Sequence, residues 1–358
     1  MASLDVSSYG DLVNAAKINY GPSKIQQIAQ NYVDYPLFQL FFKKERMKED
    51  GGQLIQRNLH LKKSVRARFK GIAAPDTVKI SDLTAQTQIP WRFADTHWAF
   101  VDQDVALARN EHQIIDLIEV RRNDAYIDLI EMLEAALWTA PGTSNTTDIY
   151  GVPYYVVKNA TTGHTGTVPG SHTSVANVSP TTYTNWRNYA GLYTSVTKAD
   201  LLRTMRQGMR YCGFRNMEML KMNNYRDKAD KYVIICNFTT IASFEDLGEA
   251  QNENLGPDLA SMEVNSKAKD IYSVEGVLTF RRKPIMGCQY LDGDSSNPVY
   301  GLATDYWCMY VHDKFNFREF PVKEVADTHG AYYVPMDLWC NLLCLDRRRN
   351  FVFATSAS

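Results

Sequence analysis

Few stretches of this sequence combine residue types that could bind a ligand or catalyse a reaction. The stretch LDGDSSNP begins like a calcium-binding loop, because Asp292 and Asp294 stand two residues apart. Such a loop requires glycine at its sixth position and glutamate at its twelfth, where this chain has Asn297 and Ala303. The Asp, Gly, Ser, Asn and Pro residues favour a tight surface turn instead.

The sequence also lacks the patterns of common catalytic sites. GLYTSVTK, residues 191–198, lacks the second glycine and the Lys-Ser/Thr order of a phosphate-binding loop. Neither the GxSxG nor the HExxH pattern occurs in the chain. We therefore expect no cofactor and a structural protein, not an enzyme. An active site in the Thr/Ser-rich loop at 159–184 is a distant alternative.

The six cysteines are scattered at positions 212, 236, 288, 308, 340 and 344, mostly among apolar or aromatic neighbours. This placement predicts reduced, buried thiols. Cys340 and Cys344 are spaced closely enough to share a site, but no histidine or further cysteine stands nearby. We predict no metal site.

Composition limits the remaining classes of function. The chain is 45% hydrophobic and 22% charged, as expected of a folded protein, and its net charge is -1. A protein that holds nucleic acid by its phosphates usually carries a clear positive excess. The first residues show no signal peptide, and no run approaches the roughly 18 apolar residues of a membrane span.

One segment nevertheless is strongly basic. Residues 53–80 carry seven Lys or Arg and one acid, Asp76. SVRARFK and TVKIS alternate with period two around GIAAPD, which predicts a long hairpin or ribbon. Its candidate contact residues are Arg57, Lys62, Lys63, Arg66, Arg68 and Lys70.

A long helix with the opposite charge is expected next in the chain. Apolar residues recur at helical spacing between 110 and 139, with Asn110 as a candidate N-cap and Pro141 as a stop. Seven acids and two bases, Arg121 and Arg122, give this stretch a net charge of -5, against +6 for the ribbon. The acids are Glu111, Asp116, Glu119, Asp124, Asp128, Glu131 and Glu134.

The opposite charges predict a contact between subunits. A ribbon of one copy lying over the acidic helix of the next is a head-to-tail contact, which builds rings and larger closed assemblies. Two alternatives remain open: a solvated ribbon and helix that never meet, and a ribbon that grips DNA. Arg347, Arg348 and Arg349 are predicted to form a solvated strand end, or a contact with phosphate or a neighbouring chain.

The remaining elements indicate an α+β fold. Residues 1–50 resemble an extended arm with a short helix, interrupted by Pro22 and Pro36. A second helix is expected between a capping box at Thr197/Asp200 and a stop at Gly213. KYVIICN predicts a buried strand, FTTIASFEDLGEAQNE a helix, and strands dominate from Ile271 onward. Segregated helices and strands are typical of α+β proteins.

This order of elements resembles that of the major capsid proteins of tailed bacteriophages. The resemblance spans the whole chain and includes the phrases DIYGVPYYVV, NWRNYAGLYTSVTKADLLRTMRQGM, VEGVLTFRRKPIMG and DLWCNLLCLDRRRNFVF. It implies an α+β capsid fold with an N-terminal arm, an E-loop ribbon, a P domain with a long spine helix, and an A domain. The implied divisions are 1–50 for the arm, 51–108 for the E-loop and a P-domain strand, 109–140 for the spine helix, 141–300 for the A domain, and 301–358 for returning P-domain strands.

The resemblance also implies a function and partners. Copies would form pentamers and hexamers of an icosahedral or prolate head around double-stranded DNA, made in the bacterial cytoplasm and located in the virion. Portal and decoration proteins are implied partners, with weak, non-specific DNA contact. The chain reaches its arm without the long scaffolding segment of many relatives, which predicts a separate scaffolding protein. Some relatives crosslink subunits through lysine, but nothing here selects Lys62, Lys63 or Lys70 for that role. An encapsulin-like cellular shell is the alternative assembly.

Overall fold

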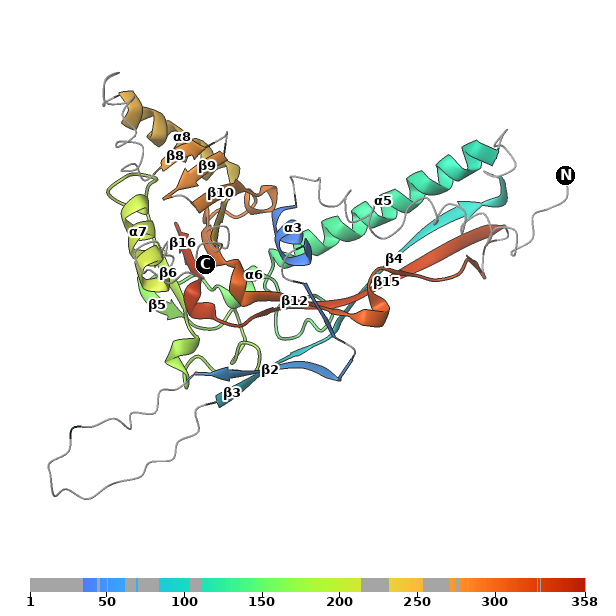
Figure 1. The fold of residues 1–358 in the computed structure, drawn as a ribbon, viewed down its shortest axis with the longest axis horizontal. Coiled ribbons are helices and arrows are strands. Elements are labelled where there is room, and N and C mark those ends of the chain that lie inside the picture. Colours follow the sequence, from blue (N-terminus) through green and yellow to red (C-terminus); the bar gives the residue numbers. More distant parts are fainter. Residues whose placement is uncertain are drawn as a thin grey trace.

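The longest element of the computed structural model is helix α5 (Glu111–Leu137), which confirms the helix expected at 110–139 (Figure 1). Its 27 residues span roughly 40 Å at 1.5 Å per residue. Ile118, Ala125 and Tyr126 lie on its buried side and pack against Trp98 and Phe100. Helix α5 therefore covers one face of the sheet that contains these two aromatic residues.

The structure describes residues 35–43, 46–49, 51–61, 69, 84–103, 111–213, 232–253, 271–274, 277–281, 283–326, 328 and 330–357. The predicted strands SVRARFK (except Phe69) and TVKIS, the turn GIAAPD, the Asn110 cap and most of the N-terminal arm lie outside these residues. Within the described parts of the chain, no helix is long and apolar enough to cross a membrane.

A six-stranded sheet lies beneath α5. Its centre is the long strand β15 (Ala331–Cys344), which pairs antiparallel with β4 (Arg92–Val101) over ten positions, from Ala331↔Val101 to Cys340↔Arg92. The sheet is completed by β1 (Arg46–Glu49), β12 (Trp307–His312), β13 (Arg318–Glu319) and β14 (Lys323–Glu324). Trp98, Val334 and Met336 point under the helix because alternate residues of a strand face the same side.

An eight-stranded sheet forms the other half of the molecule. Its strand order is β5-β6-β16-β11-β7-β10-β9-β8. The strands are β5 (Gly163–Gly166), β6 (Asn188–Leu192), β7 (Tyr232–Cys236), β8 (Ile271–Val274), β9 (Val277–Phe280), β10 (Lys283–Gly287), β11 (Val299–Ala303) and β16 (Phe351–Ala354). The last strand, β16, pairs with β6 and β11, so the stretch 301–358 divides between the two sheets.

The helices around this sheet match two of the expected segments. Helix α7 (Leu201–Cys212) ends at Gly213, whose φ of 73° is the left-handed conformation that favours glycine. Helix α8 (Phe238–Glu253) and strand β7 also lie where the sequence predicts them. The capping box is wrong: Asp200 is the N-cap, and its carboxylate accepts from the amides of Thr194 and Ser195. The short helix α6 (Val152–Tyr155) follows α5.

The ribbon is present at its base. Strands β2 (Leu54–His60) and β3 (Thr84–Pro90) pair antiparallel from Leu54↔Pro90 to His60↔Thr84. His60 and Thr84 pair with each other at one end of this hairpin. The basic segment that connects them in the sequence therefore leaves β2 and enters β3 at that end. This end of the ribbon points away from α5 (Figure 1).

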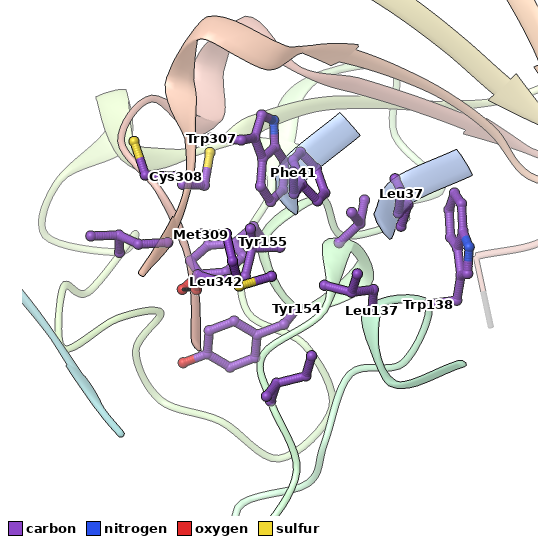
Figure 2. Packing of buried hydrophobic residues seen from close by; sticks show 14 of the residues in the cluster. Leu37, Phe41, Leu137, Trp138, Tyr154, Tyr155, Trp307, Cys308, Met309 and Leu342 are labelled. Carbon is purple, nitrogen blue, oxygen red and sulfur yellow. Dashed lines mark hydrogen bonds between the residues drawn. The ribbon is translucent and has the colours of Figure 1, made fainter. Parts of the chain in front are cut away.

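A short helix, α3 (Pro36–Lys43), ties the arm to the core. The sequence reading treats Pro36 as an interruption, whereas it is the first residue of the helix, where its missing N–H is no loss. Phe41 stacks on Trp307 with ring centroids 5.5 Å apart, and Leu37 lies near Leu137 and Trp138 (Figure 2). The arm helix therefore joins the core that both sheets share.

Candidate assembly surfaces

The outer face of α5 carries a row of acids. Asp124, Asp128 and Glu131 are exposed and follow one another at spacings of four and three residues, which places them on one side of the helix. Val120 and Met132, 66% and 46% exposed, lie beside this row. We call Asp124, Asp128 and Glu131 the acidic row. Glu119 is half-buried, and for Glu111 and Asp116 only the helical backbone is described.

The two bases of α5 face the sheet instead. The Nε of Arg122 lies 2.6 Å from Oε1 of Glu319, in an ion pair with both side chains under 10% exposed. The hydroxyl of Tyr126 donates to the same oxygen at 2.8 Å. Nη1 of Arg121 donates to the carbonyl of Ala99 at 3.0 Å. These two guanidinium groups contact the sheet side of α5, whereas the acidic row lies on its exposed side.

Glu134 does not belong to the outward-facing acids, and its assignment as an intersubunit contact is corrected here. The side chain is fully buried. It accepts from the amides of Leu37 at 3.2 Å and Phe38 at 2.7 Å, and from Nε1 of Trp138 at 2.9 Å. The carboxylate thus caps the N-terminus of α3 from 97 residues away. Burial raises the pKa of Glu134 to about 7, although all three donors favour the charged form.

Arg57 is also used inside its own subunit. Its Nε donates to the hydroxyl of Tyr310 at 2.8 Å, and the guanidinium lies over the same ring, 5.1 Å from the centroid. This contact fixes β2 against β12. Of the candidate ribbon residues, Lys62, Lys63, Arg66, Arg68 and Lys70 lie outside the described part of the chain. Arg57 is half-buried and not enclosed by its own subunit, so its intersubunit role stays a prediction, as do those of the other five.

The three consecutive arginines each have an internal partner. Arg347 is fully buried and donates to the carbonyls of Tyr155 at 2.6 Å, Trp186 at 2.8 Å and Thr167 at 2.8 Å. Burial lowers the pKa of Arg347 to about 10, so it stays charged at neutral pH. This guanidinium joins three loop segments and is not a surface contact.

Arg348 and Arg349, which follow Arg347, are closer to solvent. Nη1 of Arg348 donates to Oδ1 of Asn185 at 2.6 Å. Arg349 pairs with Asp346 at 3.5 Å and lies over the ring of Tyr306. The expectation of a contact with phosphate or a neighbouring chain is thus wrong for Arg347, and stays a prediction for Arg348 and Arg349.

The remaining chemically interesting residues form structural contacts. Asp294 binds the ammonium group of Lys158 and the hydroxyl of Ser296 inside the turn at 292–297, so a lysine takes the place a cation would occupy. All six cysteines are buried and free. Burial raises the pKa of Cys288 and Cys340 to about 12, which suppresses thiolate formation. In the described ranges, no group of three or more His, Cys, Asp or Glu side chains is placed to hold a metal.

Solved structures show where this architecture occurs. The capsid asymmetric unit of cyanophage A-1(L) aligns with 91% of this chain and 94% of its own, at 14% identity and a TM-score of 0.58. The chain has the capsid fold of tailed phages. The encapsulin of the holo-SrpI complex from Synechococcus elongatus PCC 7942 shares this fold at 11% identity and a TM-score of 0.50. The alignment covers 91% of this chain and 89% of the encapsulin chain.

A structure from Mycobacterium phage Bobi aligns over 90% of each chain at 8% identity and a TM-score of 0.49. No protein-family model and no curated protein matches the sequence. Because the sequence identities are this low, the structural likeness establishes the fold alone. The role of the chain is a separate question.

Sequence reasoning expected a short helix in the arm but did not place it at Pro36–Lys43, and it missed the cap of this helix. A signal was present: Pro36 is followed by apolar residues at 37, 38, 41 and 42, which is helical spacing after a proline start. Glu134 had a weaker signal, because its neighbours one turn away include Ile130, Leu137 and Trp138, all apolar. Its partner amides lie nearly a hundred residues earlier and could not be identified from spacing.

Proposed function

We propose that this chain is the structural subunit of a viral shell, in which copies form pentamers and hexamers of an icosahedral or prolate head around double-stranded DNA. The observation that carries the proposal is the likeness, along nearly the whole chain, to the cyanophage capsid structure. Neighbouring structures of this fold are shell components, which favours a structural and non-enzymatic role. The subunit would lie in the virion after synthesis in the host bacterial cytoplasm.

The basic segment and the acidic row supply the proposed contact between copies. The ribbon ends at His60 and Thr84, on the side of the molecule away from α5 (Figure 1). A basic segment that leaves from this end is better placed to meet the helix of a second copy than its own. Each exposed pair contributes about 0 to 1 kcal/mol, so a row of pairs sets register and partner choice more than affinity.

Other partners follow from a DNA-containing head. We propose a separately encoded scaffolding protein, a portal and decoration proteins, with weak and non-specific contact to the packaged DNA. The net charge of -1 suits a wall that encloses DNA without binding it tightly.

Purified protein is expected to assemble. Negative-stain electron microscopy, with light scattering on the same sample, should show rings, tubes or closed shells. The assembly should weaken as salt rises, because exposed ion pairs are screened. A protein that stays monomeric at every concentration and salt level would contradict the proposal. If that monomer bound duplex DNA with a steep salt dependence, a DNA-binding role for the ribbon would replace the shell proposal.

Charge reversal tests the pairing itself. Arg66→Glu with Arg68→Glu should lower the assembled fraction roughly tenfold, because each lost pair is worth up to about 1 kcal/mol and repulsion is added. Adding Asp128→Arg and Glu131→Arg should restore part of the assembly. Glu245→Arg with Asp246→Arg, on the exposed side of α8, is the matched control and should restore none. Normal assembly by the first variant would eliminate the pairing.

An encapsulin-like shell is the second candidate, because the encapsulin structure shares the fold over a similar length. The contents of assembled particles distinguish the two. Nuclease-protected double-stranded DNA in native particles supports the viral head, whereas a packaged protein cargo without DNA supports the cellular shell.

A further inference from the structure

A strained turn lies against the base of the ribbon. Val175 and Val178 exchange both backbone hydrogen bonds at 3.0 Å, which encloses Ala176 and Asn177 in a two-residue turn. These two residues have φ angles of 50° and 63°. Such a turn is usually formed by Asn-Gly or Gly-Gly, because side chains other than Asn and Asp rarely adopt positive φ. Alanine at the first position is therefore conformationally strained.

The surroundings force this conformation. Val175, Ala176 and Val178 are buried, and the hydroxyl of Tyr154 accepts from the amide of Ala176 at 3.2 Å. Nε1 of Trp186 donates to the carbonyl of Val175 at 3.2 Å. Strain that is held in place by its surroundings often marks a functional position.

The strained residues contact one residue of the ribbon. The amide of Gln88 in β3 donates to the carbonyl of Ala176 at 3.0 Å, and Nδ2 of Asn177 donates to Oε1 of Gln88 at 3.1 Å. The left-handed conformation turns the Ala176 carbonyl toward this edge of the ribbon. A turn with ordinary φ angles would point that carbonyl elsewhere and lose the contact.

The same segment holds the ribbon at its other end. Nδ2 of Asn185 donates to the carbonyl of Leu61 at 2.9 Å, and Arg348 donates to the Oδ1 of Asn185 from behind. Residues 175–185 thus contact the ribbon near Pro90 and again where β2 ends. The chain enters β2 through Gly51 and Gly52, whose φ angles of 136° and 108° are accessible to glycine alone.

We propose that residues 175–185 form a brace that fixes the direction of the outer end of the ribbon, beyond the base that Ile55 and Ile89 anchor in the core. This inference rests on the proposed function, since the direction of the ribbon determines where its basic end meets a second copy. The contacts at Asn177 and Asn185 are exposed hydrogen bonds, which water can replace at small cost. The brace therefore holds the free subunit in one geometry and can open without unfolding it.

The direction of the ribbon can be measured on the full-length, unassembled subunit. Because the native cysteines are buried, spin labels can be attached at Asn58→Cys in β2 and Arg203→Cys in α7, both exposed positions. Pulsed electron–electron resonance should give one narrow distance distribution in the otherwise unchanged protein. Asn177→Ala with Asn185→Ala should broaden or shift it, and amide exchange at Gln88 should rise at least tenfold. Ala176→Gly should keep the distance and raise the unfolding temperature, because glycine removes the strain.

The matched control is Thr181→Ala with Thr182→Ala, two exposed positions of the same segment. If the Asn177/Asn185 variant has the control's distance distribution and exchange rate, the brace does not exist. If Ala176→Gly lowers the unfolding temperature, the turn is not strained and the inference fails in that part. Neither measurement requires assembly, so a chain that forms no shells would refute the proposed function and leave the brace to be decided separately.

Discussion

Replacing Arg347 by methionine is expected to remove a large part of the stability of the folded subunit. Methionine fills a similar volume but leaves the carbonyls of Tyr155, Trp186 and Thr167 without the donor each has now. A buried acceptor left without a partner costs about 1 to 3 kcal/mol, so the buried carbonyls of Tyr155 and Trp186 amount to about 2 to 6 kcal/mol, and half-buried Thr167 adds less. The whole free energy of unfolding of a domain is typically about 5 to 15 kcal/mol.

The adjacent arginine provides the control for this prediction. Arg348 is exposed and its guanidinium donates to Asn185, so Arg348→Met should cost less than about 1 kcal/mol. Arg347→Lys keeps the charge but cannot direct several donors in a plane, so it should resemble the methionine variant more than the parent. Urea unfolding of the three variants measures these differences. Equal stability of the Arg347 and Arg348 methionine variants would show that the buried guanidinium does not hold the loops together.

Arg347 also shows where sequence reasoning reaches its limit. The run Arg347–Arg349 is visible as a cluster of positive charge, yet its members have unrelated tasks in the structure. Arg347 binds carbonyls up to 192 residues away, and no local pattern encodes that distance. A charge count assigns every arginine to the surface, because burial of a charge depends on acceptors contributed by other segments.

Periodicity predicted the long elements for a physical reason. The apolar spacing of α5, the buried strand β7 and the glycine that ends α7 are local features, and each records which side of its own element is covered. The order of such elements was enough to identify the capsid fold. Of the seven acids predicted as contacts on this helix, the structure leaves Asp124, Asp128 and Glu131 exposed on one side, and their contact with a second copy stays a prediction.

Charge counting failed where a charge is used inside the subunit. Arg122 pairs with Glu319 across 197 residues, Arg57 with Tyr310 across 253, and Glu134 with the arm helix across 97. All three residues connect elements that are distant in the chain. The net charges of the ribbon and the helix count every charged residue, including those used inside the subunit. Only charged side chains that remain exposed can contact a neighbouring copy. Among the described side chains of α5, the acids that remain exposed are Asp124, Asp128 and Glu131.

Glu134→Gln is expected to release the arm helix from α5 and to lower the free energy of unfolding by about 1 to 3 kcal/mol. The NH2 group of the glutamine would face an N–H group that needs an acceptor. Oε1 of Glu134 now accepts from Leu37 and Trp138, and Oε2 accepts from Phe38. Glutamine supplies one carbonyl oxygen, so either one or two of these donors must lose their acceptor. Amide exchange of residues 37–42 should accelerate more than that of α5. Glu131→Gln, one turn away and exposed, is the control and should change neither exchange nor stability.

The pH dependence of stability tests the same carboxyl group. The pKa of Glu134 rises from 4.5 to about 7 on folding, so the folded state binds more protons than the unfolded state between these values. Stability therefore falls as pH rises from about 4.5 to 7, by up to about 3 kcal/mol. The Glu134→Gln variant lacks this dependence, so its deficit relative to the parent should be largest near pH 5 and shrink toward pH 8. Unfolding midpoints in urea across this range measure the difference between the two proteins. A deficit that grows with pH would mean that the three N–H donors lower the pKa of Glu134 more than burial raises it, so that the arm is held by a permanently charged carboxylate.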